Sequence, residues 1–132
     1  MKNIKIVYWI IAAIVLLVVI TLLIRGSEDN WIKNSRGVYI EHGHPKNMPQ
    51  EVEDQQRIIE AAQSLFEAAT LNEQDLSSGP CLGTVENYAV DITHDPRQAV
   101  DDEQKNQCQD YIDGKVSNYI ELDQNGEVLR VK

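Results

Sequence analysis

The stretch Ile6–Ile24 reads IVYWIIAAIVLLVVITLLI, and every other expectation about the chain depends on it. Thr21 is its only residue without an apolar or aromatic side chain. A helix of these 19 residues is about 28 Å long, which matches the bilayer's hydrocarbon core of about 30 Å. Tyr8 and Trp9 lie at its N-terminal end, and such amphipathic aromatics prefer the membrane interface. The sequence therefore predicts a transmembrane helix over residues 6–24.

The flanks of this stretch favour an uncleaved signal anchor in the cell membrane. A secretory signal peptide has an apolar region of about 7–15 residues followed by a small-x-small cleavage site, and neither feature is present before Arg25. Residues 1–5 form a short basic tail with two lysines, whereas Glu28 and Asp29 follow the stretch. Lysine or arginine residues occur on both sides of the apolar stretch, so the positive-inside rule alone gives no orientation of the helix in the membrane. The basic tail and the cysteines discussed below favour a cytoplasmic N-terminus and an extracytoplasmic C-terminal domain.

The rest of the chain is short and acidic. Ten of the 12 basic residues and all 21 acidic residues follow residue 24, which gives that part a net charge of -11 in a chain whose net charge is -9. The total length of 132 residues leaves room for one folded domain. A domain of this charge repels phosphates and has no basic stripe, which excludes nucleic acid as a partner. We expect the bilayer, through residues 6–24, and a protein of unknown identity as the partners.

Local patterns divide the acidic part into a tether, residues 25–30, and a domain, residues 31–132. Residues 31–33 and 38–42 are typical of a hairpin around a glycine-containing turn. Apolar residues at spacings of three and four predict an amphipathic helix from Pro49 to about Ala69. Tyr88, Val90 and Ile92 alternate with other residues, as in a half-buried strand.

The C-terminal part of the domain carries the strongest hairpin signal. Residues 115–122 and 127–131 flank Asp123-Gln-Asn-Gly126, and Asn and Gly tolerate the positive φ of tight turns. The acidic positions of this turn mimic half of a calcium loop, but Lys132 stands where the bidentate glutamate is required. Gly114 is placed to end a helix in the later part of residues 97–113. We therefore predict an α+β fold, in which the amphipathic helix packs on an antiparallel sheet of the Tyr88 strand and the C-terminal hairpin.

Cys81 and Cys108 are the only cysteines, and a disulfide between them is the simplest interpretation in an extracytoplasmic domain. A thioredoxin-like redox site needs two cysteines separated by two residues, and this pair lies much farther apart in sequence. A catalytic pair of a cysteine with His94 has no local signature to support it.

Three histidines are the candidate metal ligands. His42 and His44 lie two residues apart, so in an extended chain they project to the same side, and His94 is a third candidate ligand if the fold brings it close to them. A zinc site needs three or four ligands in fixed geometry, whereas exposed histidines in a Gly-Pro loop are common without a metal. We therefore expect no metal site and no cofactor.

Motifs of catalysis are missing from the sequence. There is no glycine-rich phosphate loop, no Gly-x-Ser-x-Gly and no His-Glu-x-x-His. No two acids share an apolar run that would raise a pKa, so we expect no paired-carboxylate hydrolase and no catalytic residues. The sequence favours a non-catalytic interaction or accessory module of the cell envelope. The alternative is a small envelope enzyme or metal-binding protein that uses His42, His44 and His94.

Overall fold

The computed structural model of the chain describes residues 2–25 and 29–132, so residues 26–28 of the expected tether lie outside the described residues. The chain divides into two compact units. The first unit contains the residues up to Ile32 together with Glu41–Met48, and the second contains Lys33–Ile40 and Pro49–Lys132.

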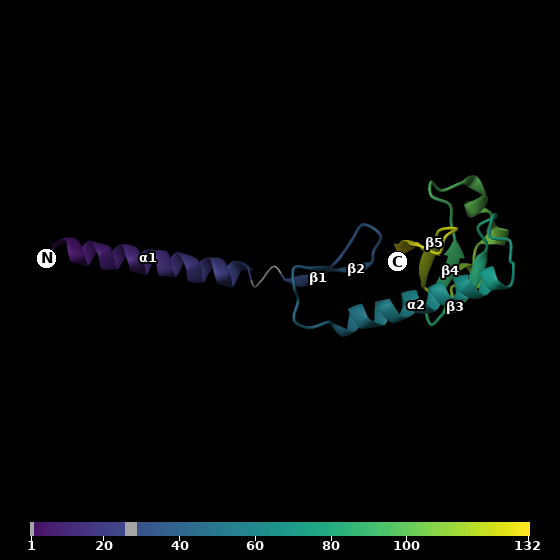
Figure 1. The fold of residues 1–132 in the computed structure, drawn as a ribbon. Coiled ribbons are helices and arrows are strands. Elements are labelled where there is room, and N and C mark those ends of the chain that lie inside the picture. The colour runs from purple at the N-terminus through teal and green to yellow at the C-terminus, as the bar shows by residue number, and fades with distance from the viewer. Residues whose placement is uncertain (1, 26–28) are drawn as a thin grey trace. The chain divides into compact units, whose positions relative to one another are not determined.

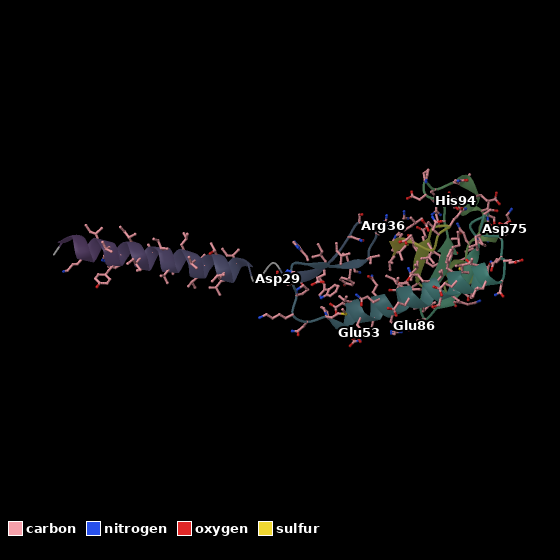
Figure 2. All side chains as sticks on the ribbon, viewed as in Figure 1. Asp29, Arg36, Glu53, Asp75, Glu86 and His94 are labelled. Carbon is pink, nitrogen blue, oxygen red and sulfur yellow. A yellow bond between two sulfur atoms is a disulfide. The ribbon has the colours of Figure 1, made fainter. Side chains whose placement is uncertain are left out.

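The first unit is dominated by the helix α1, Lys2–Arg25. Its stretch Lys5–Ile24 has the length and composition to cross a membrane, and none of that stretch is buried. Apolar side chains project on every side of this helix (Figure 2). The predicted apolar helix is thereby confirmed. Beyond it, the strands β1, Asn30–Lys33, and β2, Tyr39–His42, form a two-stranded sheet at the predicted hairpin.

The second unit consists of one long helix, α2 (Gln50–Leu71), and a four-stranded sheet (Figure 1). The strand order is β3-β4-β5-β6. The strands are β3 (Cys81–Val85), β4 (Tyr88–Ile92), β5 (Asn118–Leu122) and β6 (Val128–Val131). Three short helices lie between β4 and β5: η1 (Ala99–Asp102), η2 (Gln104–Asn106) and α3 (Gln109–Ile112).

The sheet is mixed, so the prediction of an antiparallel sheet was wrong. β4 pairs parallel with β5, whereas β3 with β4 and β5 with β6 are antiparallel. Residues 93–117 form the crossover that two parallel neighbours require, because a tight turn can join only antiparallel strands. The C-terminal hairpin is confirmed, and Asp123 Oδ1 accepts the N–H groups of Asn125 and Glu127 in its turn at 2.8 and 2.9 Å.

The helix α2 covers one face of this sheet and forms the main core with it. It begins after Pro49, which leaves no unsatisfied N–H at that position. Its apolar stripe packs on alternate residues of the strands, since successive strand residues point to opposite faces. The buried members of this core are Ile58, Ala62, Val90, Ile92, Ile120, Leu122 and Val131.

The crossover, residues 93–117, packs on the opposite face of the sheet. A second, smaller apolar cluster of Ala89, Cys108 and Val116 joins the crossover to β4. In the crossover Gly114 has φ +69° just past α3, as predicted for the end of a helix. The strand residues whose side chains point away from the main core therefore lie between the sheet and the crossover. The polar side chains of the domain's interior are among them.

A turn of residues 34–37 lies beside the outer edge of β6. The N–H of Val131 donates to the carbonyl of Arg36 at 2.8 Å, so this edge of the sheet is partly paired. Gln55 of α2 fixes the turn from the other side, because its amide nitrogen donates to Gly37 O at 2.9 Å and its Oε1 accepts the Tyr39 N–H at 2.7 Å. Gly37 has φ +78°, and a Cβ at this position would lie 2.2 Å from Val131 O.

Candidate functional site

One row of side chains crosses the sheet on the face that the crossover covers. Asp91 of β4 pairs in register with Cys81 of β3 on one side and with Glu121 of β5 on the other. Glu121 in turn pairs with Arg130 of β6. Side chains in register on neighbouring strands point to the same face. The row Cys81–Asp91–Glu121–Arg130 is therefore contiguous, and we call it the polar row.

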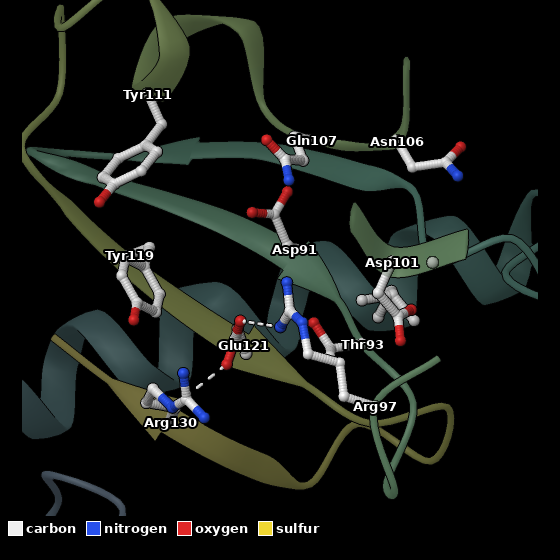
Figure 3. A pocket seen from close by; sticks show the side chains of 12 residues that line it. Asp91, Thr93, Arg97, Asp101, Asn106, Gln107, Tyr111, Tyr119, Glu121 and Arg130 are labelled. Carbon is white, nitrogen blue, oxygen red and sulfur yellow. Dashed lines mark hydrogen bonds and ion pairs between the residues drawn. The ribbon is translucent and has the colours of Figure 1, made fainter. Parts of the chain in front are cut away.

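Three members of the polar row, Asp91, Glu121 and Arg130, line a pocket of about 200 Å³ (Figure 3). Arg97 enters from the crossover and lies between Asp91 and Glu121. Tyr111 and Tyr119 close one side with their rings packed edge to face, their centroids 5.5 Å apart. The pocket thus combines carboxylates, guanidinium groups and phenols in a small open recess.

Glu121 is held between two guanidinium groups. Arg97 Nη1 lies 2.7 Å from Glu121 Oε1, and Arg130 Nε lies 3.5 Å from Glu121 Oε2. Arg97 also donates to Asp102 Oδ1 from Nε at 3.0 Å and from Nη2 at 2.9 Å. The Glu121 side chain is 10% exposed, whereas those of Arg97 and Arg130 are 40% and 54% exposed. The Glu121 carboxyl group therefore lies deep in the pocket, and the two guanidinium groups form its rim.

Asp91 is in a different electrostatic state from its neighbour. Burial raises the pKa of Asp91 to about 6 from 3.8, and the negative charge of Glu121 adds to this increase. The N–H of Cys108 and the charge of Arg97 act in the opposite direction and lower this pKa. Asp91 Oδ1 is buried and has no hydrogen-bond partner among the described residues. Burying such an oxygen costs much free energy when the group is an ionised carboxylate, and much less when it is a neutral carboxylic acid.

The disulfide lies beside this carboxyl group. Cys81 and Cys108 are bonded, as predicted, and the bond joins β3 to the crossover. A carboxylate oxygen of Asp91 and the two Sγ atoms all lie within 4.8 Å of one another. Within residues 2–25 and 29–132 this is the one group of three potential metal ligands so close together. Its two sulfurs are bonded to each other and are not thiolates, so they do not serve as metal ligands.

His94 follows β4 and makes two side-chain contacts. Its Nδ1 lies 2.7 Å from Oδ1 of Asp101, and its Nε2 lies 2.8 Å from the amide nitrogen of Gln124. The amide nitrogen can only donate, so Nε2 accepts and Nδ1 carries the proton. Burial alone would raise the pKa of Asp101, but N–H donors from Gln98 and His94 bring it below its ordinary value. His94 therefore fastens the start of the crossover to the turn after β5.

The other two candidate histidines lie in the first unit. His42 is the last residue of β2 and His44 follows it in a loop, and both are exposed. No histidine belongs to the one close group of potential metal ligands found among the described residues. Metal binding by His42, His44 and His94 stays the alternative hypothesis, which a metal titration of the whole chain can test.

No family model, curated protein or solved structure matches this chain. The function of the pocket therefore has to follow from the chemistry of its own residues.

Sequence reasoning missed the pairing of Asp91 and Glu121. The two acids lie in separate stretches of the sequence, so the expectation that no acid pair shares one apolar run did not anticipate a pair formed across two strands. The two strands do carry a common signal, because each places its acid between apolar residues, in Val90-Asp-Ile92 and Ile120-Glu-Leu122. Successive residues of a strand point to opposite faces of the sheet, so an acid between two apolar residues lies on the face opposite the apolar core. Two strands with this pattern indicate a polar group on that face.

Proposed function

We propose that the chain is a single-pass membrane protein whose acidic domain lies outside the cytoplasm and binds a protein partner through the pocket of the polar row. The domain acts as a binding module of the cell envelope and not as a catalyst. The observation that carries the proposal is the pocket itself, an open recess in a small domain in which two exposed arginine side chains lie beside the carboxyl groups of Asp91 and Glu121.

The anchor rests on α1. A helix that is apolar on every side and exposed over Lys5–Ile24 needs an apolar surrounding. The orientation rests on the short basic tail and on the disulfide, because such bonds persist in oxidising compartments outside the cytoplasm.

The binding role rests on the distribution of charge in the pocket. Arg97 and Arg130 are positioned by Glu121, so their outer donors are available to a partner without further ordering of the side chains. Arginine presents several N–H donors in a fixed plane and is enriched where proteins recognise carboxylates. A partner that offers a carboxylate to this rim fits the pocket better than a cation does.

The absence of catalysis rests on how the two carboxyl groups are used. Glu121 has an arginine at each oxygen, and the partnerless oxygen of Asp91 is buried. Neither group is therefore placed to act as a general acid or base on a substrate bound in the open part of the pocket.

Topology is tested by labelling intact cells with a membrane-impermeant maleimide, with and without prior reduction. Labelling of Cys81 and Cys108 only after reduction supports an extracytoplasmic, disulfide-bonded domain. Labelling that requires lysis of the cells puts the domain in the cytoplasm and contradicts the proposed orientation.

Binding is tested by placing a photo-crosslinking amino acid at Arg130, on the rim, and as a control at Glu67, on the exposed side of α2. We expect irradiation of intact cells to give a discrete cross-linked product from position 130 and none from position 67. A second variant, Arg97→Glu with the cross-linker at 130, should lose the product. Equal cross-linking at 130 and 67, or none at 130, contradicts the proposal.

A further inference from the structure

The carboxyl group of Asp91 and the disulfide form a cluster that the proposed binding role does not use. Both sulfurs lie within 4.8 Å of an Asp91 oxygen, and the N–H of Cys108 hydrogen-bonds to the same carboxyl group. One oxygen of this group has no partner among the described residues although it is buried. Burying a carboxyl oxygen without a hydrogen-bond partner is costly, so the position of Asp91 Oδ1 next to a disulfide calls for a chemical explanation.

The two sulfurs differ in access. Cys81 lies at the start of the edge strand β3 and is half-buried, whereas Cys108 is 1% exposed. We therefore expect an external thiol to attack Cys81 Sγ, the sulfur of the more exposed cysteine, so that Cys108 Sγ is the sulfur that leaves. Thiol–disulfide exchange requires a thiolate in line with the bond, and it is faster when the leaving sulfur is readily stabilised.

The surroundings of Cys108 do not stabilise a leaving thiolate. Its Sγ lies 3.4 Å from the carbonyl oxygen of Gly83 and 3.5 Å from that of Val90. These oxygens present negative ends of dipoles, and the site is closed to water. A thiolate formed at this position must take up a proton as it forms, and Asp91 is the titratable group in contact range.

We propose that Cys81, Cys108 and Asp91 form a thiol–disulfide exchange site for a dithiol, in which Cys81 is attacked, Cys108 leaves and Asp91 donates the proton. The first thiolate of the dithiol bonds to Cys81 Sγ as the S–S bond breaks, and Cys108 Sγ leaves with the electron pair. The acid form of Asp91 protonates this sulfur and becomes a carboxylate.

The second half of the reaction completes the balance. The other thiolate of the dithiol attacks its own sulfur in the mixed disulfide and releases Cys81, which takes up a proton from water. The two protons lost by the dithiol equal the two gained, one by Cys81 and one by Asp91 as it returns to its acid form. Two electrons pass from the dithiol to the protein, and the dithiol leaves as a disulfide.

Other charged groups act on Asp91 and set the pH at which it can donate. Glu121 on β5 favours its protonated form, and Arg97 from the crossover favours its ionised form. From β3 the neighbour is Cys81, and from the crossover it is also Cys108. The remaining titratable groups that line the same pocket are those of Tyr111, Tyr119, Asp101 and Arg130.

The test is the rate at which dithiothreitol reduces the full-length chain in nonionic detergent, followed by mass spectrometry after alkylation, from pH 5 to pH 8. Asp91→Asn keeps the size of the side chain but cannot donate the proton. The ratio of the wild-type rate to the Asp91→Asn rate cancels the ionisation of the reductant. We expect this ratio to be about 100 at pH 5, the lower end for a positioned proton donor, and to approach one by pH 8.

The matched control is Asp110→Asn, which removes an exposed carboxylate two residues from Cys108 and should follow the wild type at every pH. A second variant, Glu121→Gln, should shift the pH profile to lower pH, because it removes a charge that favours protonated Asp91. Circular dichroism verifies that each variant is folded. A wild-type to Asp91→Asn ratio that does not change with pH overturns the proposal, even if all variants are reduced at different rates. This outcome is independent of any partner or membrane orientation.

Discussion

Asp91 and Glu121 lie side by side on parallel strands, and only one of them has a full set of partners. Glu121 has an arginine at each oxygen, whereas Asp91 has one buried oxygen without a partner among the described residues. Burial dominates at Asp91, and its pKa rises to about 6. The stability of the domain should therefore depend on pH in part through this side chain.

Asp91→Asn should stabilise the protein at pH 8 and have little effect at pH 4. The folded chain holds the Asp91 proton up to about pH 6, whereas the unfolded chain releases it near 3.8. The wild type therefore loses stability as the pH rises from about 4 to 6, and the loss amounts to about 3 kcal/mol. The variant avoids this loss, and thermal unfolding followed by circular dichroism at both pH values measures the difference. A variant that is less stable than the wild type at pH 8 contradicts the assignment.

The titration of Asp91 should respond in opposite directions to its two charged neighbours. Glu121→Gln removes a negative charge and should lower the pKa of Asp91, whereas Arg97→Gln removes a positive charge and should raise it. Carbon-13 NMR of the labelled carboxyl group reports both midpoints. If the two variants titrate together with the wild type, Asp91 does not sense these groups.

Replacing both cysteines by alanine should lower the free energy of unfolding by about 3.5 kcal/mol. The disulfide closes a loop of Cys81 to Cys108 with a sequence separation of 27 residues, and in the chain-entropy model such a loop restricts the unfolded chain by this amount. Thermal unfolding of the double variant against the oxidised wild type measures the change. A loss below about 1 kcal/mol would show that the crossover is held mainly by its packing and hydrogen bonds.

Gly37→Ala should destabilise the protein more than Gly114→Ala. Both glycines have a positive φ, +78° and +69°, so both substitutions carry the conformational cost of about 1 kcal/mol. A Cβ on Gly37 also lies 2.2 Å from Val131 O, whereas a Cβ on Gly114 meets nothing within 4 Å. Amide hydrogen exchange should show the Val131 N–H less protected in Gly37→Ala alone. Equal Tm values for the two variants would contradict the close approach of the turn to β6.

The elements that the sequence predicted correctly are those with a local cause. The helix after Pro49 follows from a periodic apolar stripe, and the hairpin around Asp123 follows from turn chemistry within a few residues. The disulfide followed from the small number of cysteines. Each of these signals can be recognised in one segment or in the composition, without knowledge of which distant segments are in contact.

The features that the sequence did not predict depend on contacts between distant segments. The strand Cys81–Val85 contains a glycine and lacks clear alternation, so only its pairing with β4 reveals it. The parallel pairing of β4 with β5 depends on the path of the crossover, which has only short helices. Asp91 and Glu121 became neighbours through that pairing, and no local pattern places one beside the other.

The disulfide also determines how the chain responds to tension. Its Cα atoms are 4.9 Å apart, whereas the residues between them would span roughly 90 Å as an extended chain. A force applied to the two ends of the chain passes through the disulfide and not through the backbone between Cys81 and Cys108. The segment of β3, β4 and the first part of the crossover is therefore not extended. Glu121 and Arg130 lie outside this loop and can be drawn away, whereas Cys81 and Asp91 stay together. An extension experiment should therefore recover that hidden length only in the reduced protein.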